Sequence, residues 1–314
     1  MGETGRFPHE IIVALPPLIA TFPSPSSSTI DLGSLTIHMY GLMLLIAIAA
    51  CIALTGYRWV RLGGDWDLVF RVAVWGVAFG VVGARIYHDI TSWSEVPDEW
   101  WGFAAVWEGG LGVWGGILLG CLAGAVVIRR SGQSVRLFAD AVAPGLLLAQ
   151  GIGRWGNWWN QELFGKPTSL PWGLEIDLEH RQSLPVQYQN TAGTPHYHPT
   201  FLYEFVFDVL MAGAVILVGK RFRIRPPALF ALYVSIYTLG RTFEELLRID
   251  PSGHFLGERT NFWVSIVVFV CSTAFFVWWQ FVREPGADPE VARRKVIEQG
   301  PTMAVPKGRV RPRR

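Results

Sequence analysis

Residues 137–165 read LFADAVAPGLLLAQGIGRWGNWWNQELFG, a membrane-length apolar run that ends in an arginine, two asparagines and a glutamate. An ionisable side chain at bilayer depth costs several kcal/mol unless it is paired, and for that reason it usually marks a functional site. Arg154 therefore predicts a transmembrane helix that has a functional site near its end.

The composition places the whole chain among membrane proteins. Of its 314 residues, 51% are hydrophobic and only 17% are charged, and the mean hydropathy is +0.31. This is too apolar for an ordinary soluble domain. Runs long enough to cross a bilayer core of about 30 Å occur at residues 36–57, 68–88, 110–128, 137–156, 201–219, 227–247 and 261–282. We therefore expect an all-α polytopic membrane protein with seven transmembrane helices.

The basic residues are distributed unevenly along the chain. Most of the 27 lysines and arginines lie in the turns that follow the odd-numbered apolar runs and in residues 283–314. Because basic loops are retained in the cytoplasm, this asymmetry predicts an amino terminus outside the membrane and a cytoplasmic carboxyl terminus.

Three regions follow from this topology. Residues 1–35 are rich in proline and serine and lack a basic leader, so we expect a loosely ordered outer extension rather than a cleaved signal sequence. Residues 36–282 form the transmembrane domain, and residues 160–199 are a polar, non-helical insert in it. Residues 283–314 are basic and poor in apolar side chains, and we expect a disordered cytoplasmic tail.

Three arginines, Arg85, Arg154 and Arg241, lie inside apolar runs. Their three helices are all expected to run outward, and each arginine lies in the last few turns, so the cations should converge in the outer leaflet. The helices that enter from outside add further polar side chains at this level, namely His38, Tyr40, His198, Tyr203 and Glu204. The pattern predicts a polar pocket beneath the outer surface.

A phosphate is the ligand that such a pocket suits. Guanidinium groups make bidentate, charge-assisted hydrogen bonds to phosphate that lysine cannot copy, and a phospholipid headgroup is the nearest abundant phosphate. In the alternative interpretation, each arginine only pairs with a glutamate such as Glu245 or Glu204 and joins helices. Asn157 and Asn160 are expected to orient hydroxyl groups of the headgroup.

Two other classes of protein fit an arginine-containing bundle. A transporter or flippase of an anionic lipid also places arginines along its path, but it should have polar residues in both leaflets and repeated halves, and neither is visible in the sequence. A sensor or assembly factor without catalysis would not require three arginines at one level. An enzyme that acts on a phospholipid is therefore favoured.

The sequence contains no familiar cofactor or metal signature. There is no HExxH, GxSxG or Walker motif and no clustered set of cysteines and histidines. We therefore expect no cofactor, no metal and no nucleic-acid partner.

At the level of motifs the chain resembles the prolipoprotein diacylglyceryl transferases, a family of bacterial membrane enzymes. The longest match is the family signature, which is carried by Gly153, Arg154, Gly156, Asn157, Asn160, Glu162 and Gly165. Shorter matches are dispersed along residues 36–282, namely His38–Gly41, Gly83–Arg85, Trp107–Gly110, His198–Glu204, and Tyr237 with Arg241, Glu245 and Arg248.

The resemblance implies a fold, a location and a reaction. The fold is a seven-helix domain in the bacterial plasma membrane with a small extracytoplasmic head at residues 160–199. The reaction moves the sn-1,2-diacylglyceryl group of phosphatidylglycerol to the lipobox cysteine thiol of a prolipoprotein. It forms a thioether and releases glycerol 1-phosphate. The implied partners are therefore phosphatidylglycerol and a lipobox peptide.

The resemblance also implies roles for individual residues, with Arg154 and Arg241 as the essential phosphate ligands. The catalytic residues that we expect are Arg154, Arg241, Tyr40, Asn157, His38 and His88. The expected substrate-binding residues are Arg154, Arg85, Asn160, Glu162, Gly165, Tyr203, Glu204, Tyr237 and Glu245.

One position departs from the family pattern. Many relatives have a histidine where this chain has Trp114, and tryptophan cannot accept a proton. The base that deprotonates the thiol is therefore left open among His38, His88, His198, Glu162 and Tyr40. A histidine titrates closest to working pH, and His38 and His88 rank first because both should lie near the outer ends of helices, adjacent to Tyr40 and Arg85. The thiol can also ionise without a base, in the positive field of the arginines.

Overall fold

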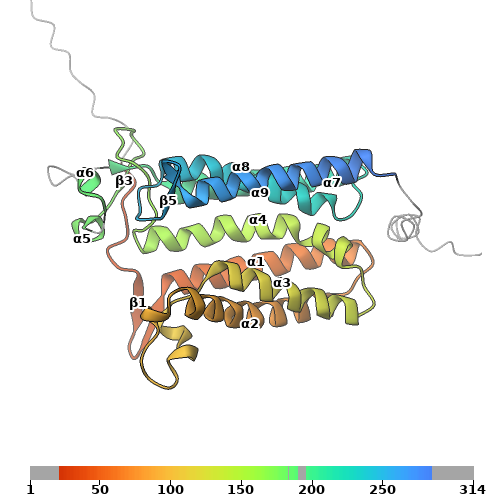
Figure 1. Cartoon of the computed structure of the whole chain (residues 1–314), viewed down its shortest axis with the longest axis horizontal. Coiled ribbons are helices and arrows are strands. Elements are labelled where there is room, and N and C mark those ends of the chain that lie inside the picture. The colour runs from red at the N-terminus through yellow and green to blue at the C-terminus, as the bar shows by residue number, and fades with distance from the viewer. Residues whose placement is uncertain (1–20, 183, 190–195, 285–314) are drawn as a thin grey trace, which may run out of the picture.

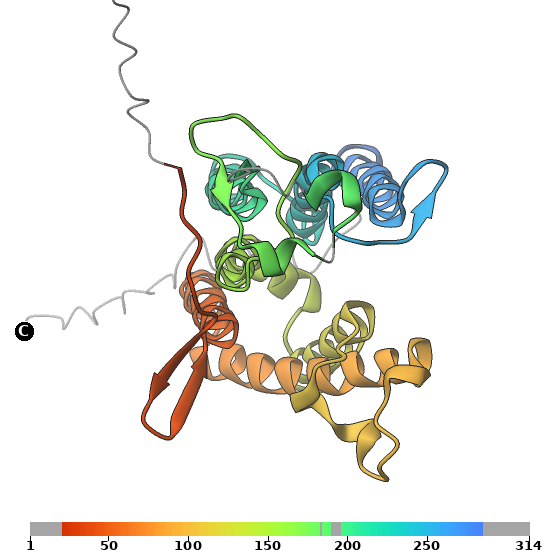
Figure 2. The ribbon, with the colours of Figure 1, turned by 90° about the vertical axis from the view of Figure 1, so that its left-hand side faces the viewer.

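Seven long helices form the body of the molecule in a computed structural model that describes residues 21–182, 184–189 and 196–284. Most of them run along one common direction in Figure 1, whereas Figure 2 shows α2 lying across the others. Their bounds are α1 (Met39–Arg61), α2 (Trp66–Thr91), α3 (Val113–Arg130), α4 (Val135–Trp159), α7 (Thr200–Arg221), α8 (Ala228–Leu247) and α9 (Thr260–Val277), which continues as a π-helical turn, Trp278–Val282.

The helix α4 lies at the centre of this bundle. It packs against α1 on one side and against α7 and α8 on the other, while α2 pairs with α3 and α8 with α9. Figure 2, which looks along the helices, shows α4 between the α1–α2–α3 side and the α7–α8–α9 side. A residue near the end of α4 is therefore placed to meet residues from both sides.

Local sequence signals explain where two of the helices begin. Asp65 accepts a hydrogen bond from the backbone N–H of Leu68 at the start of α2, and Ser134 accepts one from Leu137 at the start of α4. Gly83 of α2 lies against α3 so closely that a Cβ there would be 2.3 Å from the carbonyl oxygen of Gly115. Small residues allow helices to approach this closely in a membrane.

Six helices in the described part of the chain are long and apolar enough to cross a membrane, namely α1, α2, α3, α4, α7 and the Thr260–Val282 helix. The expected polytopic, largely helical class is therefore confirmed. The helix α8 coincides with the expected run at 227–247 but is not among the six. It contains three ionisable residues within two turns, Arg241, Glu244 and Glu245.

Short elements gather at one end of the bundle, on the left in Figure 1. They are three antiparallel strand pairs, β1 (Thr29–Leu32) with β2 (Leu35–His38), β3 (Leu174–Glu175) with β4 (His196–Tyr197), and β5 (His254–Phe255) with β6 (Glu258–Arg259). Short helices complete the set, namely α5 (Leu178–Arg181), α6 (Val186–Gln189) and the 3-10 turns Trp93–Glu95, Gly102–Ala104 and Val106–Glu108. We call the segments 160–199 and 248–259 together the head.

The head shares an apolar core with the first turn of α7. Phe164, Leu174, Tyr197 and Phe201 are buried there together. The described part of the amino-terminal extension contacts this core, because Phe22 pairs with Leu174 through its backbone and packs on Phe201. The 160–199 segment, expected to be non-helical, contains short helices and strands. The amino-terminal extension, expected to be loosely ordered, makes these contacts at Phe22. Residues 1–20 and 285–314, which include most of the expected tail, lie outside the described residues.

Candidate active site

Arg154 of α4 and Arg241 of α8 meet at one carboxylate oxygen of Glu204, which projects from α7. Oε2 of Glu204 lies 2.8 Å from Nε of Arg154 and 3.2 Å from Nη1 of Arg241. The Glu204 side chain is 5% exposed, and those of the two arginines are 19% and 12% exposed. Two guanidinium groups from separate helices thus share one anion inside the bundle, where solvent screening is weak.

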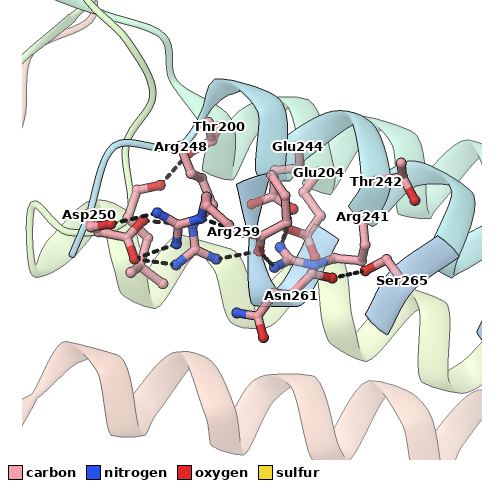
Figure 3. Close-up of polar contacts among 12 residues, drawn as sticks. Thr200, Glu204, Arg241, Thr242, Glu244, Arg248, Asp250, Arg259, Asn261 and Ser265 are labelled. Carbon is pink, nitrogen blue, oxygen red and sulfur yellow. Dashed lines mark hydrogen bonds and ion pairs between the residues drawn. The ribbon is translucent and has the colours of Figure 1, made fainter. Parts of the chain in front are cut away.

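Arg241 has two further carboxylate partners on its own helix. It forms ion pairs with Glu244 and with Glu245, which follow it by three and four residues, a spacing that places side chains on one face of a helix. We call Arg154, Glu204, Arg241, Glu244 and Glu245 the arginine–carboxylate cluster. Figure 3 shows Glu204, Arg241 and Glu244 turned toward one another.

Glu245 connects this cluster to the head. Its second oxygen lies 2.7 Å from Nε of Arg259, and Arg259 in turn pairs with Asp250 at 2.9 Å. Arg248 also pairs with Asp250, at 2.8 Å (Figure 3). Burial alone would raise the pKa of Asp250, but hydrogen bonds from Arg248 and Arg259 outweigh it and hold the pKa below its usual value. Each of these charges is therefore compensated.

The family-signature residues form a second chain of contacts that starts at Arg154. Its Nη1 donates to Oδ1 of Asn157 at 3.5 Å, and Nδ2 of Asn157 donates to Oε1 of Glu162 at 2.7 Å. Asn160 donates to the same Glu162 oxygen at 3.4 Å. The ring of Tyr40 lies over this part of α4, where a Cβ on Gly156 would be only 2.6 Å from its Cδ2 atom.

A pocket opens beside the arginine–carboxylate cluster between α7 and α8. Its volume is about 200 Å³. The residues that line it are Tyr203, Glu204, Phe207, Asp208, Tyr237, Gly240, Arg241, Phe243, Glu244 and Leu247. Four expected site residues, Tyr203, Glu204, Tyr237 and Arg241, thus surround one cavity.

Gly165 lies where the head meets α7 and α8. Its N–H donates to the carbonyl of His198 at 2.9 Å, and its backbone pairs with that of Arg248 in an isolated antiparallel β-bridge. A Cβ at this position would be 2.8 Å from Cβ of His198, so only glycine fits without movement. Nδ1 of His198 lies 3.2 Å from the Tyr203 hydroxyl, and burial, together with the charge of Lys166, lowers the pKa of His198.

The third intramembrane arginine, Arg85, has a separate set of partners. Its guanidinium donates to the carbonyls of Gly102 at 2.6 Å and Gly109 at 2.9 Å, and it pairs with Asp89 at 3.0 Å. Among the described residues, these contacts hold the 102–110 loop, and none of them is with Glu204. The imidazole of His88 adjoins the same loop, because a Cβ on Gly110 would be 2.5 Å from its Nε2 atom.

Two further positions considered for the base, His38 and Trp114, lie at the starts of α1 and α3. His38 ends β2 and immediately precedes α1, and its side chain is exposed. Trp114 lies in the first turn of α3 and is 52% exposed. In the part of the chain that the structure describes, no hydrogen bond or ion pair joins His38 or Trp114 to the arginine–carboxylate cluster.

Several charged residues near the site were not identified from the sequence. Glu244 and Asp208 follow expected site residues by three and four positions on the same helix, so helical spacing was the signal that would have found them. Arg259 and Asp250 had no such signal. They reach Glu245 only because the loop after α8 folds back over the helix end.

The helices and the cluster define a multi-pass membrane protein with a buried arginine–carboxylate site. The family model described as prolipoprotein diacylglyceryl transferase matches residues 27–278, and the chain belongs to this family.

Three relatives, each named a phosphatidylglycerol–prolipoprotein diacylglyceryl transferase, illustrate the match. The chain is 42% identical over 296 residues to the Frankia alni protein, covering 92% of this chain and 75% of the relative. It is 44% identical over 266 residues to the second such transferase of Streptomyces coelicolor, covering 82% and 81%. It is 40% identical over 288 residues to the Bifidobacterium adolescentis protein, covering 88% and 84%.

Proposed function

We propose that this chain transfers the sn-1,2-diacylglyceryl group of phosphatidylglycerol to the lipobox cysteine thiol of prolipoproteins, forming a thioether and releasing glycerol 1-phosphate. It is a transferase of lipoprotein biosynthesis. The assignment depends on one observation: in a chain of this family, Arg154 and Arg241 both form ion pairs with Glu204. A conduit for lipid has no comparable support.

Arg154 and Arg241 bind the phosphate of the lipid. Both guanidinium groups are neutralised by carboxylates in the described structure, so the phosphate has to replace one of these partners. Glu245 is also held by Arg259, whereas Glu204 is the one carboxylate that both arginines share. A phosphate oxygen at the Glu204 Oε2 position would accept from both arginines, each of which has five N–H donors.

This arrangement suits displacement at a primary carbon. The thiolate sulfur forms a bond to the glyceryl carbon while the carbon–oxygen bond breaks, and the electron pair of that bond goes to the phosphate oxygen. The guanidinium groups stabilise the charge that grows on the leaving phosphate more than they stabilise the intact lipid. The thiol proton leaves to a base, for which we propose His38 or His88, and the released phosphate monoester is the glycerol 1-phosphate.

The signature residues support the phosphate site from α4. Asn157 accepts from Arg154 and donates to Glu162, so it orients the guanidinium fork. Tyr40 closes the same side of the site over Gly156. Gly165 acts from the head by allowing the loop to pack closely, and Glu245 acts from α8 by holding Arg241.

We further propose seven membrane spans, with α8 among them, and an extracytoplasmic head. Support for the α8 span comes from its packing along α7 and α9 and from the complete burial of the Glu245 side chain. Support for the orientation comes from the basic last turns of α1, α3 and α7, namely Arg58, Arg61, Arg129, Arg130, Lys220 and Arg221. The amino terminus would then lie outside and residues 283–314 in the cytoplasm.

The decisive experiment uses purified full-length protein, phosphatidylglycerol and a lipobox peptide. Mass spectrometry should detect the diacylglyceryl thioether on the peptide cysteine, and Arg241→Ala should abolish that product. Arg61→Ala, which removes a cation stacked over Tyr57 of α1, serves as the matched control and should keep full activity. Absence of the thioether with well-inserted wild-type protein would refute the assignment.

A further inference from the structure

Asp208 is a buried carboxylate that the mechanism above does not use. It lies on α7 four residues after Glu204, which is one helical turn or about 6 Å deeper. Its side chain is 0% exposed, and neither carboxylate oxygen has a hydrogen-bond partner among the described residues. Burying a carboxyl group without partners is costly, and an orphaned polar group in a native structure calls for an explanation such as a ligand.

The surroundings of Asp208 belong to the pocket beside the arginine–carboxylate cluster. Asp208, Arg241, Glu244 and Tyr237 all line that cavity of about 200 Å³. On the α4 side its neighbour is Gly151, where a Cβ would be 3.1 Å from Cβ of Asp208. The α4 backbone therefore passes close to Asp208, because position 151 has no side chain.

Several other polar groups near the site have partners, although Oε1 of Glu204 has none among the described residues. The hydroxyl of Tyr233 donates to Gln150 at 3.2 Å. The side-chain amides of Asn157 and Asn160, which were expected to orient headgroup hydroxyls, both donate to Glu162. Glu204 and Glu244 each accept from Arg241. Among the carboxylates that line the pocket in the described structure, Asp208 is the one with both oxygens lacking a donor.

We propose that Asp208 accepts hydrogen bonds from the hydroxyl groups of the terminal glycerol of phosphatidylglycerol, and that it thereby selects this headgroup. The inference rests on the proposed function, because the position of the terminal glycerol follows from where Arg154 and Arg241 bind the phosphate. A carboxylate offers only acceptors, and the terminal glycerol offers two neighbouring hydroxyl donors. One helical turn separates Glu204 from Asp208, which is a distance that a phosphate-linked glycerol spans.

The size and outline of the pocket agree with this occupant. A volume of about 200 Å³ is smaller than the roughly 300–1,000 Å³ typical of ligand pockets, which suits a phosphoglycerol group and not two acyl chains. Phe243 lines the same pocket and is 64% exposed, so the cavity reaches the surface of the bundle on the α8 side. The acyl chains would remain in the lipid there while the headgroup enters.

The test compares two lipid donors that differ only in the hydroxyl groups. Phosphatidylpropanol has the same phosphate charge as phosphatidylglycerol and a terminal propyl group instead of glycerol. A site that hydrogen-bonds a substrate hydroxyl rejects the analogue that lacks it, so wild-type kcat/KM should favour phosphatidylglycerol by about 100-fold, the effect of two hydrogen bonds to a charged group. In Asp208→Leu the ratio should fall to within a few-fold of one.

Two variants make the comparison specific. Asp208→Asn keeps the shape and one acceptor, and it should lower the preference for phosphatidylglycerol by about ten-fold, equivalent to one hydrogen bond. If the leucine variant does not fold, the asparagine variant tests the inference in its place. Val215→Ala changes a fully buried apolar residue farther along α7 and should affect both donors equally. Because the readout is a ratio, a merely structural role of Asp208 would not move it.

The outcomes separate the inference from the proposed function. If the wild-type protein transfers from phosphatidylglycerol but accepts phosphatidylpropanol equally well, the Asp208 inference is overturned and the transferase assignment stands. A wild-type ratio that persists in both Asp208 variants overturns it as well. If the wild-type protein transfers from neither lipid, the proposed function fails and the inference fails with it.

Discussion

Arg154 and Glu204 form an ion pair, 2.8 Å from Nε to Oε2, between the last turns of α4 and the start of α7. The same Glu204 oxygen accepts from Arg241. One carboxylate oxygen thus marks the point at which two guanidinium groups from separate helices can hold a single anion.

Arg154→Lys should reduce diacylglyceryl transfer by about 100-fold or more. Lysine keeps the charge but lacks the planar fork that reaches Glu204 and Asn157 together, and loss of one oriented donor at a developing anion has an effect of this size. The measurement is kcat for thioether formation. Activity within a few-fold of wild type would show that charge alone suffices at this position.

Glu245→Gln should destabilise the protein and also lower its activity. Its fully buried side chain pairs with Arg241, Arg248 and Arg259, and removing one partner of a buried ion pair typically costs about 3–5 kcal/mol. Thermal unfolding in detergent measures the loss. Asp67→Asn, which breaks an exposed pair with Arg71, is the matched control and should leave the unfolding temperature unchanged.

Gly165→Ala should weaken the contact between the head and α7. The new methyl group would lie 2.8 Å from Cβ of His198 and 3.1 Å from Cγ2 of Thr200, and overpacking of this kind costs about 1–3 kcal/mol. Gly213→Ala is the matched control, because a Cβ there has no neighbour within 4 Å. Equal unfolding temperatures for the two variants would contradict the packing role.

His38→Gln and His88→Gln test the base. If one of these imidazoles takes the thiol proton, its replacement should lower kcat by about 10²–10⁴-fold, and addition of a small imidazole buffer should restore part of the rate. The other single variant should behave as wild type. Full activity in the double variant would eliminate both residues and favour ionisation of the thiol in the field of the arginines.

Asp250 should make stability depend on acidity. Hydrogen bonds from Arg248 and Arg259 hold its folded-state pKa below its ordinary value, so its contribution is fully present above the unfolded-state pKa of about 3.9 and is lost as pH falls through the folded-state pKa. Asp250→Asn should therefore lower the unfolding temperature at pH 7. The difference from wild type should shrink below about pH 4. A constant difference from pH 7 to pH 3 would mean that the carboxylate charge is not the cause.

The membrane helices were predictable from the sequence because their cause is local. A helix satisfies its backbone hydrogen bonds within one segment, so a long apolar run suffices to specify it in a bilayer. The expected runs at 36–57 and 137–156 correspond to Met39–Arg61 and Val135–Trp159. Helical spacing also contained the pairing of Arg241 with Glu245, since the two residues are one turn apart.

Arg85 marks the limit of such reasoning. Depth in the membrane placed it with Arg154 and Arg241, yet its contacts lie with Asp89 and the 102–110 loop. Depth gives a position along a helix but no direction around it. That direction follows from the packing of α2 against α3, where glycines allow the backbones to approach closely.

By itself, then, the sequence determined the family, the helical runs and the arginines that lie at bilayer depth, because each depends on composition or on neighbours along the chain. Only the tertiary structure decided that Glu204 joins Arg154 to Arg241 and that Asp208 is buried without a partner. These relationships depend on how α4, α7 and α8 are rotated against one another. That rotation results from side-chain packing between segments far apart in the chain, which no local pattern encodes.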